Sequence, residues 1–430
     1  MSSFFGLLAL AAAAIPFLTQ AAPVSTPVAG QVVSGKWIIT LQPNADVATI
    51  ASHISKVREI HARNIGHRSV AEDELGGVER QYGFGSFKGY AGSFDEATIE
   101  ELRNLPEVLT TGLCTMSLIL TNLQVLNVEE DSIMTTFDFV TQSNTTNWGL
   151  ATISSRTNGA EDYIYDSSAG QGNYNYVVDT GVRTTHQEFE GGRAVWGYNA
   201  VNDKNTDNAG HGTHVAGIMV DSTYGVAKKA TVVAVKIFEG NSGQMSTVIA
   251  GFNWAVNDIV AKNRTNTAVI NMSLGGAASA TWDAAITAAW NQGVLAVVAA
   301  GNENRDASLV SPARSPEVIC VGNLQRNDSR YGGTSGSNYG PAVDIFAPGT
   351  GIVSSYRTSD TATQSLSGTS MASPHVAGLV SYLRGLEGPS SASAIKARVL
   401  ELATPDRVID AKGSANLIAY NGAEGNEEDE

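Results

Sequence analysis

Short apolar runs alternate with amphipathic stretches and Gly-rich turns from about Trp148 onward. This alternation is typical of an α/β fold, in which helices join the strands of a parallel sheet. The runs are apolar throughout, which indicates strands that are covered on both faces. Because parallel strands end at one edge of their sheet, we expect the working side chains to gather at that edge. The predicted strands are Tyr174–Val178, Thr231–Val235, Ala268–Met272, Val294–Ala299 and Val318–Val321.

The preceding part of the chain has a different pattern, which predicts a small α+β unit. Gly35–Leu41 and Tyr90–Phe94 are patterned as strands, and Asp46–Ile60 places apolar residues at helical spacing. A capping box, Ser-Phe-Asp-Glu from Ser93, predicts a helix over Asp95–Leu105. A unit of about a hundred residues is large enough to fold alone.

The two ends of the chain have their own composition. An apolar stretch, Phe4–Leu18, is followed by small residues with a cleavage pattern near Ala21, which predicts a signal peptide over 1–21. A membrane anchor is the alternative, but the stretch is shorter than about 18 to 20 residues and Pro16 interrupts it. Residues 423–430 are acidic and are expected to form a solvated tail.

The charge balance excludes one class of partner. The 430 residues include 42 acidic and 27 basic side chains, for a formal charge of −15. Nucleic-acid binding needs clustered Lys and Arg, and the sequence has no such run, so we expect no nucleic-acid partner. Only two cysteines occur, Cys114 and Cys320. Cys320 lies in an apolar strand and is expected to be a buried free thiol.

Three polar residues stand in motifs that suit nucleophilic catalysis. Asp179 closes the strand in YNYVVDTGV, His211 opens GHGTHVAG, and Ser370 lies in SGTSMASPH. Asp179 alone could be an ordinary turn residue. The chain order Asp, His, Ser is, however, one of the three orders in which unrelated folds build the same triad. We therefore predict a catalytic triad of Asp179, His211 and Ser370.

Each predicted role follows from the chemistry of the side chain. A serine hydroxyl is a weak nucleophile, so Ser370 needs a base, and an imidazole such as His211 can take and return the proton. A buried carboxylate, Asp179, would orient the ring. Ser370 begins a predicted helix that ends at Leu386, so its N–H would face a developing oxyanion. Asn302, which follows a predicted strand in AAGNEN, would be the second oxyanion donor.

The ordered motifs VVDTGV, GHGTHVAG, NMSLGG, AAGNEN, SNYG, DIFAPG and SGTSMASPH resemble those of the subtilisin-like serine proteases. The likeness is greatest to the secreted fungal alkaline proteases (oryzin-type) of the proteinase K branch, and it covers nearly the whole chain. It implies a subtilisin-like parallel sheet flanked by helices, preceded by a ferredoxin-like α+β prosegment. It also implies a secreted, extracellular endopeptidase that hydrolyses proteins and peptides through an acyl-enzyme.

The resemblance also divides the chain. It implies a signal peptide (1–21), an inhibitor-type propeptide (22–137) and a peptidase domain (138–430). The propeptide would act as an intramolecular chaperone and inhibitor, and the enzyme would remove it near Asp138 to Val140. The mature enzyme is expected to be a monomer without a membrane partner.

The substrate cleft is predicted from the same resemblance. The substrate backbone would pair as an added strand with Ser273, Leu274 and Gly275 on one side and with the segment around Gly243 on the other. The S1 cleft would lie between 273–275 and the residues Ala299, Ala300 and Gly301. Its small, apolar lining suggests a hydrophobic or aromatic P1 side chain with broad tolerance. Glu303 suggests that a basic P1 group is also accepted.

A structural calcium ion is implied only by the resemblance. The proteinase K branch holds one ion by two backbone carbonyls and a carboxylate, and the matching residues are Pro316, Val318 and Asp344. Oxygen ligands of this kind suit calcium. Asp344 could equally be a capping or turn residue.

The chain departs from the family pattern in three places. Leu109–Val125 is an uncharged apolar insertion whose removal restores the usual sequence, and we hypothesise a retained in-frame intron, because such a stretch would expose an apolar loop. GIMVDSTYG, at 217–225, differs from the usual Thr- and Gly-rich stretch, which puts the packing behind His211 in doubt. In the third place, NTTNWGL at 144–150 replaces the usual Ala-Pro-Trp-Gly-Leu and creates a sequon at Asn144. Sequons also occur at Asn263, Asn271 and Asn327, but Asn271 lies in a predicted buried strand.

Other interpretations were weighed against this one. His211 and His214 do not form the H-E-x-x-H pair of a zinc protease, and His214 and His375 are expected to be core histidines. An α/β-hydrolase is not indicated either, because Gly368–Ala372 lacks the second glycine of a G-x-S-x-G elbow and the chain order is not Ser, Asp, His. A catalytically silent protein on the same fold, and a gene product whose insertion prevents maturation, remain alternatives.

Overall fold

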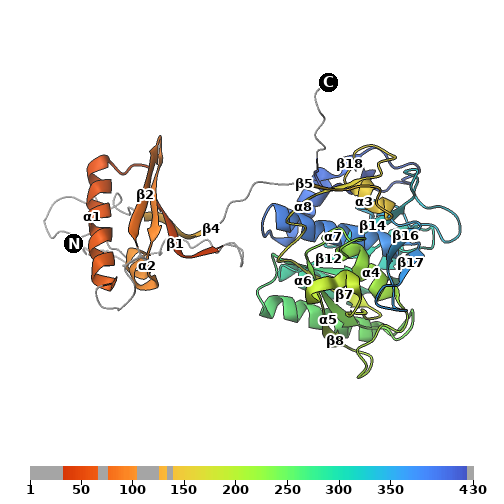
Figure 1. Cartoon of the computed structure of the whole chain (residues 1–430). Helices are drawn as coiled ribbons and strands as arrows, with labels where there is room; N and C mark the ends of the chain where they lie inside the picture. Colours follow the sequence, from red (N-terminus) through yellow and green to blue (C-terminus); the bar gives the residue numbers. More distant parts are fainter. Residues whose placement is uncertain (1–31, 66–75, 104–124, 133–138, 424–430) are drawn as a thin grey trace, which may run out of the picture. The chain divides into compact units, whose positions relative to one another are not determined.

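The computed structural model describes residues 32–65, 76–103, 125–132 and 139–423 (Figure 1). The chain divides between Thr135 and Thr136 into two compact units, close to the predicted end of the propeptide. The predicted signal peptide, Cys114, residues 109–124 of the insertion and the end of the acidic tail lie outside the described residues. In the part that the structure describes, no helix is both long and apolar enough to cross a bilayer.

The N-terminal unit is a four-stranded antiparallel sheet with two helices. The strand order β2-β3-β1-β4 and the element order β-α-β-β-α-β are those of a ferredoxin-like fold, as predicted. Trp37, Ile39 and Tyr90 of the sheet pack with Val57 of α1 and Ile99 of α2 in one core. The elements are β1 (Val32–Leu41), α1 (Val47–Ile65), β2 (Gly77–Phe84), β3 (Phe87–Ser93), α2 (Glu96–Arg103) and β4 (Val125–Ser132).

The start of α2 differs from the predicted capping box. Asp95 Oδ1 accepts a hydrogen bond from Thr98 N at 2.9 Å, so Asp95 caps the helix. Ser93 is still the last residue of β3, and its hydroxyl donates to Glu79 Oε1 across the sheet at 2.5 Å. The predicted strand and the predicted capping box both claimed Ser93, and in the structure Ser93 stays in the strand, so the cap passes to Asp95.

The C-terminal unit is built on a nine-stranded sheet in the order β18-β19-β15-β14-β12-β10-β7-β9-β8. All neighbours from β8 to β19 pair in parallel, and only β18 is antiparallel. The five predicted strands are present and lie in its middle. The strands are β7 (Tyr174–Asp179), β8 (Ala194–Asn199), β9 (Thr231–Lys236), β10 (Ala268–Met272), β12 (Leu295–Ala299), β14 (Ile319–Leu324), β15 (Ile345–Pro348), β18 (Thr404–Pro405) and β19 (Leu417–Ile418).

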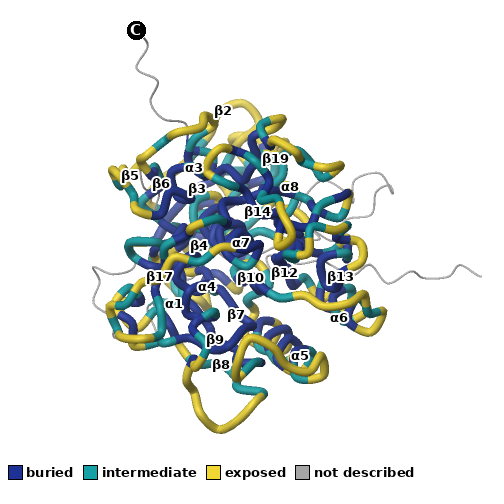
Figure 2. The backbone as a smooth tube through the Cα atoms, turned by 90° about the vertical axis from the view of Figure 1, so that its right-hand side faces the viewer, coloured by how far each residue is buried: buried dark blue, intermediate teal, exposed yellow. Residues whose placement is uncertain are grey.

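Helices cover both faces of this sheet. Along β7, Val177 packs in one core with residues of α3, α4, α7 and α8, whereas Tyr176 and Val178 pack in a second core with α5 and α6. Figure 2 shows the central strands and α7 in the buried colour and the surrounding loops in the exposed colour. The helices are α3 (Trp148–Ile153), α4 (His211–Val220), α5 (Met245–Ala261), α6 (Ala280–Asn291), α7 (Thr369–Leu386) and α8 (Ala392–Leu402).

Short strand pairs complete the unit. They are β5 (Phe139–Gln142) with β6 (Tyr163–Asp166), β11 (Gly276–Ala277) with β13 (Val310–Ser311), and β16 (Ile352–Ser355) with β17 (Thr363–Leu366). Two 3-10 segments, Gln187–Gly192 and Ala307–Leu309, lie in the connections. The parallel sheet therefore places the ends of β7, β10 and β12 along one edge, where α4 and α7 begin.

Candidate active site

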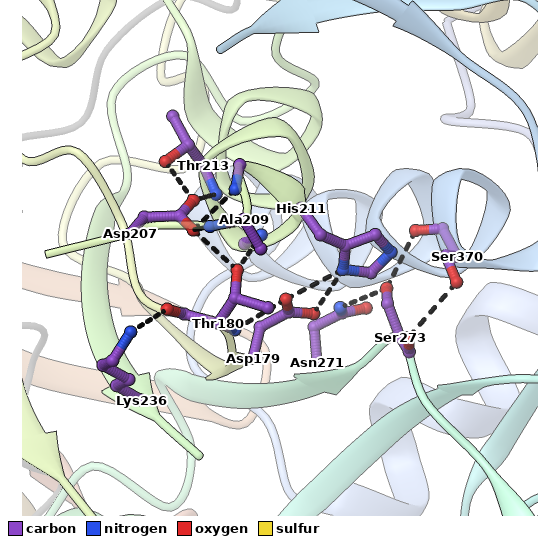
Figure 3. Close-up of polar contacts among 12 residues, drawn as sticks. Asp179, Thr180, Asp207, Ala209, His211, Thr213, Lys236, Asn271, Ser273 and Ser370 are labelled. Atoms are coloured by element: carbon purple, nitrogen blue, oxygen red, sulfur yellow. Dashed lines mark hydrogen bonds and ion pairs between the residues drawn. The ribbon is translucent and has the colours of Figure 1, made fainter. Parts of the chain in front are cut away.

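Asp179 and His211 form a hydrogen-bonded pair where β7 ends and α4 begins. His211 Nδ1 lies 2.8 Å from Asp179 Oδ1 and 3.0 Å from Oδ2 (Figure 3). The carboxylate also accepts from Thr180 N at 2.7 Å and is almost fully buried. Burial lowers the pKa of His211, but the charge and hydrogen bond of Asp179, with the charge of Asp207, more than offset this and raise the pKa above its ordinary value. The pair is therefore arranged to stabilise a protonated ring.

Ser370 lies in the first turn of α7, opposite His211. Figure 3 shows Ser370 next to the imidazole of His211, with its hydroxyl turned toward Ser273. Ser370 Oγ donates to the carbonyl oxygen of Ser273 at 3.2 Å, and no His211–Ser370 hydrogen bond is formed among the described residues. Hydrogen bonds of this kind are often long in the free enzyme and tighten when substrate binds. The structure therefore brings the three predicted triad residues together, but the hydrogen bond between His211 and Ser370 is not formed.

Pro374 explains how α7 is tied to β10 beside the serine. A proline has no N–H, so the carbonyl of Ser370, four residues earlier, loses its partner within the helix. The hydroxyl of Ser273 donates to this carbonyl at 2.8 Å and lies 2.9 Å from Ser373 Oγ. Asn271 Nδ2 donates to the same hydroxyl at 2.9 Å. The carbonyl that Pro374 leaves without a partner in the helix thus anchors Ser370 to the edge of the sheet through Ser273.

Asn302 lies next to the same helix start. Its Oδ1 accepts from Thr369 N at 2.9 Å and from Thr369 Oγ1 at 3.0 Å, which orients the amide. Gly368, with φ of 151°, precedes the helix, and a Cβ there would lie 3.6 Å from Asn302 Nδ2 and 3.7 Å from Ser370 N. Two N–H donors therefore border one small space that only a residue without a side chain leaves open.

A network around Asp207 supports His211, and the sequence did not reveal it. Asp207 Oδ1 accepts from Thr180 Oγ1 at 2.8 Å and from Gly210 N at 2.7 Å, and Oδ2 accepts from Thr213 N and Oγ1 (Figure 3). Lys236, which is fully buried, donates to the carbonyl of Thr180 at 2.9 Å. An Asp four residues before His211 was the available signal, because acidic groups favour helix N-termini.

The predicted cleft residues follow two neighbouring strands. Ser273, Leu274 and Gly275 come after β10, and Ala300 and Gly301 come after β12, the parallel neighbour of β10. The residues of both segments are small apart from Leu274, which packs partly against the core.

Two further predicted residues lie outside these two segments. Gly243 lies in the loop before α5, beside Phe238. Glu303 is exposed, and its Oε2 accepts from Asn338 Nδ2 at 2.7 Å.

Two further histidines lie in the core near the site. His214 Nε2 is 2.9 Å from the carbonyl oxygen of Gln364, and His375 Nδ1 is 2.8 Å from that of Met371. Burial lowers the pKa of each to about 4, although these carbonyls raise it in part. Both rings are therefore neutral near neutral pH and serve the packing, as predicted.

The divergent segment 217–225 does not loosen the packing behind His211. Ile218, Met219 and Val220 are completely buried in the core that α4 shares with α7. Asp221 ends the helix and accepts from Ser355 Oγ at 2.7 Å. Elsewhere, Cys320 is a buried free cysteine whose thiol pKa burial raises well above its ordinary value, as expected for an inert thiol.

The three predicted calcium ligands surround the ammonium group of Lys396. The carbonyl oxygens of Pro316 and Val318 accept from Lys396 Nζ, and Asp344 Oδ2 lies 3.7 Å from the same nitrogen. Burial raises the pKa of Asp344, although Lys396 and the Cys320 N–H lower it in part. A calcium ion at this point would share its space with an ammonium group, so the residues do not fit calcium while Lys396 is in place.

Comparison with known proteins places this geometry in a family. Residues 176–421 match the Subtilase family, and residues 36–110 match the Peptidase inhibitor I9 family. Alkaline protease 1 of Emericella nidulans is 46% identical over 425 residues, which cover 99% of this chain and 100% of the relative. The alkaline proteinase of Hapsidospora chrysogena is 46% identical over 404 residues, which cover 91% and 93% of the two chains.

A solved structure agrees with these sequence matches. The crystal structure of a cold adapted subtilisin-like serine proteinase superposes with a TM-score of 0.60 at 40% identity, covering 66% of this chain and all of the other. The fold, the prosegment and the sequence similarity over nearly the full length agree with one another. The chain therefore belongs to the subtilase family and is a serine endopeptidase with an inhibitor-type propeptide.

Proposed function

We propose that this endopeptidase acts through an acyl-enzyme, with Ser370 as nucleophile, His211 as general base and acid, and Asp179 as the group that orients His211. The observation that carries the proposal is the Asp179–His211 pair at the edge of the sheet, facing Ser370 across the start of α7. The raised pKa of His211 favours the imidazolium that the reaction forms.

The proposed steps follow from this geometry. Ser370 Oγ attacks the carbonyl carbon of the scissile bond while His211 Nε2 takes its proton. The carbonyl oxygen becomes an oxyanion, which accepts from Asn302 Nδ2 and Ser370 N. The intermediate collapses, the C–N bond breaks, and His211 returns the proton to the leaving amine. Water then attacks the Ser370 ester with His211 again as base, which releases the acid product and restores the hydroxyl.

The P1 preference is proposed to be hydrophobic or aromatic. The segments that would flank the P1 side chain, 273–275 and 299–301, contribute small residues apart from the apolar Leu274, and no charge. A large apolar side chain would bury its surface there without leaving a buried charge unpaired. Glu303 lies next to this region but is hydrogen-bonded to Asn338, so we expect a basic P1 group to be cleaved more slowly than Phe.

The precursor is proposed to be secreted and to process itself. The N-terminal pattern of residues 1–21 supports export, and the I9 match supports an inhibitory propeptide that is removed near Asp138 to Val140. Asn144, Asn263 and Asn327 are exposed and would carry glycans, whereas Asn271 is completely buried and would not.

We also propose that Leu109–Val125 is encoded by a retained in-frame intron. Val125 already pairs with Leu41 in the sheet, and the excision would leave Val108 directly before Leu126. Sequencing the transcript decides the question, since a mature message that encodes these residues would exclude a retained intron.

The test is to express the full precursor beside its Ser370→Ala variant, with Ser393→Ala, an exposed position of α8, as the matched control. Mass spectrometry follows propeptide removal, and peptides with Phe or Lys at P1 report hydrolysis. We expect parent and control to mature and cleave the Phe peptide, while Ser370→Ala stays full length with hydrolysis reduced on the order of a million-fold. Maturation and activity of Ser370→Ala would overturn the assignment of the nucleophile.

A further inference from the structure

Lys396 reaches from α8 to the loops that precede two strands of the sheet. Its Nζ donates to the carbonyl oxygen of Pro316 at 2.8 Å and to that of Val318 at 2.5 Å. The same nitrogen lies 3.7 Å from Asp344 Oδ2, and the side chain is only 16% exposed. The three oxygens therefore face one nearly buried ammonium group.

The three oxygens are held in place by the sheet itself. Pro316 and Val318 lie in the last three residues before β14, and Asp344 lies directly before β15, the parallel neighbour of β14. Asp344 N donates to the carbonyl oxygen of Cys320 at 3.0 Å, and Asp344 Oδ2 accepts from Cys320 N at 2.8 Å. The pocket of oxygens is thus set by the pairing of β14 with β15 and does not depend on α8.

The chemistry of the pocket suits a cation, and two kinds of cation would satisfy it. Calcium takes six to eight oxygen ligands at about 2.3–2.6 Å, so two carbonyls and a carboxylate would leave the remaining positions to water. A lysine ammonium has three donors, which matches the three oxygens that converge here. It carries one positive charge against the single carboxylate, so the cluster is neutral overall.

We propose that the Lys396 ammonium is a built-in cation that takes the place of a structural calcium ion in this chain. The tethered charge fastens α8 to the loops before β14 and β15 without depending on the calcium concentration. A calcium ion would have to displace Lys396 and leave a cation without its carboxylate nearby. Calcium is therefore excluded from this site, and the peptidase unit does not draw stability from calcium here.

The experiment uses the full chain carrying Ser370→Ala, which prevents self-digestion, and measures calcium binding by titration calorimetry and thermal unfolding in chelator or in calcium. In the Lys396 parent we expect no calcium binding that depends on Asp344, and a Tm that calcium shifts by less than about 1 °C. Lys396→Ala should unfold about 4 °C lower in chelator, bind one calcium ion, and recover most of this loss in calcium.

Two controls assign the response to this site. Lys396→Ala with Asp344→Asn should bind no calcium at this pocket, because the carboxylate is gone. Lys262→Ala removes an exposed lysine at the C-cap of α5 and should behave as the parent does.

The inference is overturned if the parent binds one calcium ion and Asp344→Asn abolishes that binding. It is also overturned if Lys396→Ala folds and shows no calcium response. If Lys396→Ala does not fold, Lys396→Met replaces it, because methionine keeps the packing of the side-chain stem. If neither folds, calcium titration of the parent beside Asp344→Asn tests the inference by itself.

Discussion

The two ends of α4 carry buried carboxylates in opposite surroundings. At the start of the helix, Asp207 accepts hydrogen bonds from Thr180, Ala209, Gly210 and Thr213 with both of its oxygens. Gly210 allows these contacts because its φ of +94° turns the chain into the helix, where a Cβ would collide with the ring of Tyr356. The positive end of the helix dipole also favours this anion.

At the other end, Asp221 lies where the dipole disfavours an anion. Its Oδ2 accepts from Ser355 N and Oγ, but Oδ1 is buried and has no hydrogen-bond partner among the described residues. The pKa of Asp221 is raised to about 7, chiefly by burial and also by the charge of Glu188, which together outweigh the lowering by Ser355 and Lys228. Lys228 is itself buried, which lowers its pKa to about 7.

The difference shows that one buried carboxylate, Asp207, holds the turn before His211 in place, whereas the other, Asp221, changes its protonation state. The catalytic end of α4 holds a carboxylate whose lone pairs are used by backbone and hydroxyl donors, which fixes the turn that carries His211. The far end holds a carboxyl group that changes charge near neutral pH. Substitutions at the two ends should therefore differ in size and, above all, in pH dependence.

The largest effect is expected from Asp207→Ala. The change leaves the N–H groups of Gly210 and Thr213 and the hydroxyl of Thr180 buried without their acceptor, at a cost of about 3–5 kcal/mol in the free energy of unfolding. Denaturant unfolding of the Ser370→Ala chain measures this loss. Asp203→Ala, at an exposed position of the same loop, is the control and should change stability by less than about 0.5 kcal/mol. Equal effects of the two changes would refute a supporting role for Asp207.

Asp221→Asn should have an effect that depends on pH. The folded pKa of about 7 lies above the ordinary value of 3.8, so the stability contributed by the protonated group is present below about pH 4 and is lost as pH rises to about 7. The amide cannot ionise and removes this loss. The variant should therefore be more stable than its parent at pH 8, by at most roughly 4 kcal/mol, and equal to it near pH 4.

Unfolding curves of both chains between pH 4 and 9 measure this difference. The groups that interact with Asp221 are Glu188, Lys228, Arg193, Tyr224 and, through Ser355, His186, and all are retained in the variant. A stability difference that stays constant with pH would show that Asp221 does not titrate in this window.

Thr180→Val tests one donor at the catalytic end. The substitution keeps the shape of the side chain but removes the hydroxyl that donates to Asp207 and accepts from Gly212 N at 2.9 Å. We expect a loss of about 1.5–3 kcal/mol, because the acceptor is charged. Thr180→Ser retains the hydroxyl and should recover most of the loss, and failure to do so would point to packing instead.

Ser355→Ala tests the corresponding donor at the far end and should have the smallest effect. Near pH 5, where Asp221 is protonated, the lost hydrogen bond should cost about 1 kcal/mol. At pH 8, where Asp221 is ionised, the cost should rise to about 2 kcal/mol because a charged acceptor loses its donor. Unfolding at the two pH values gives the comparison, and a cost that falls as pH rises would contradict it.

Much of the framework follows from local sequence patterns. The five predicted parallel strands are present because their side chains are apolar on both faces, which is visible in the sequence without knowing their neighbours. Asp179, His211 and Ser370 were found because each lies at the end of a strand or the start of a helix. In a parallel sheet such positions meet at one edge.

The sequence missed features that depend on pairing between distant segments. Strands β2 and β4 contain runs of consecutive polar residues, so no apolar pattern marks them, and they form through their pairing with β3 and β1. Asp207 looks like an ordinary loop residue until Thr180 and Thr213 are brought around it. The capping residue of α2 also depended on where β3 ended.

The sequence by itself determined the five central strands, the candidate triad Asp179, His211 and Ser370, and the family, because these depend on short-range patterns and on motifs at strand ends. Only the tertiary structure decided which cation faces Pro316, Val318 and Asp344. Lys396 is far from them in the chain and reaches them only because α8 packs beside the sheet. A side chain's partners are set by the packing of distant segments, which no local pattern specifies.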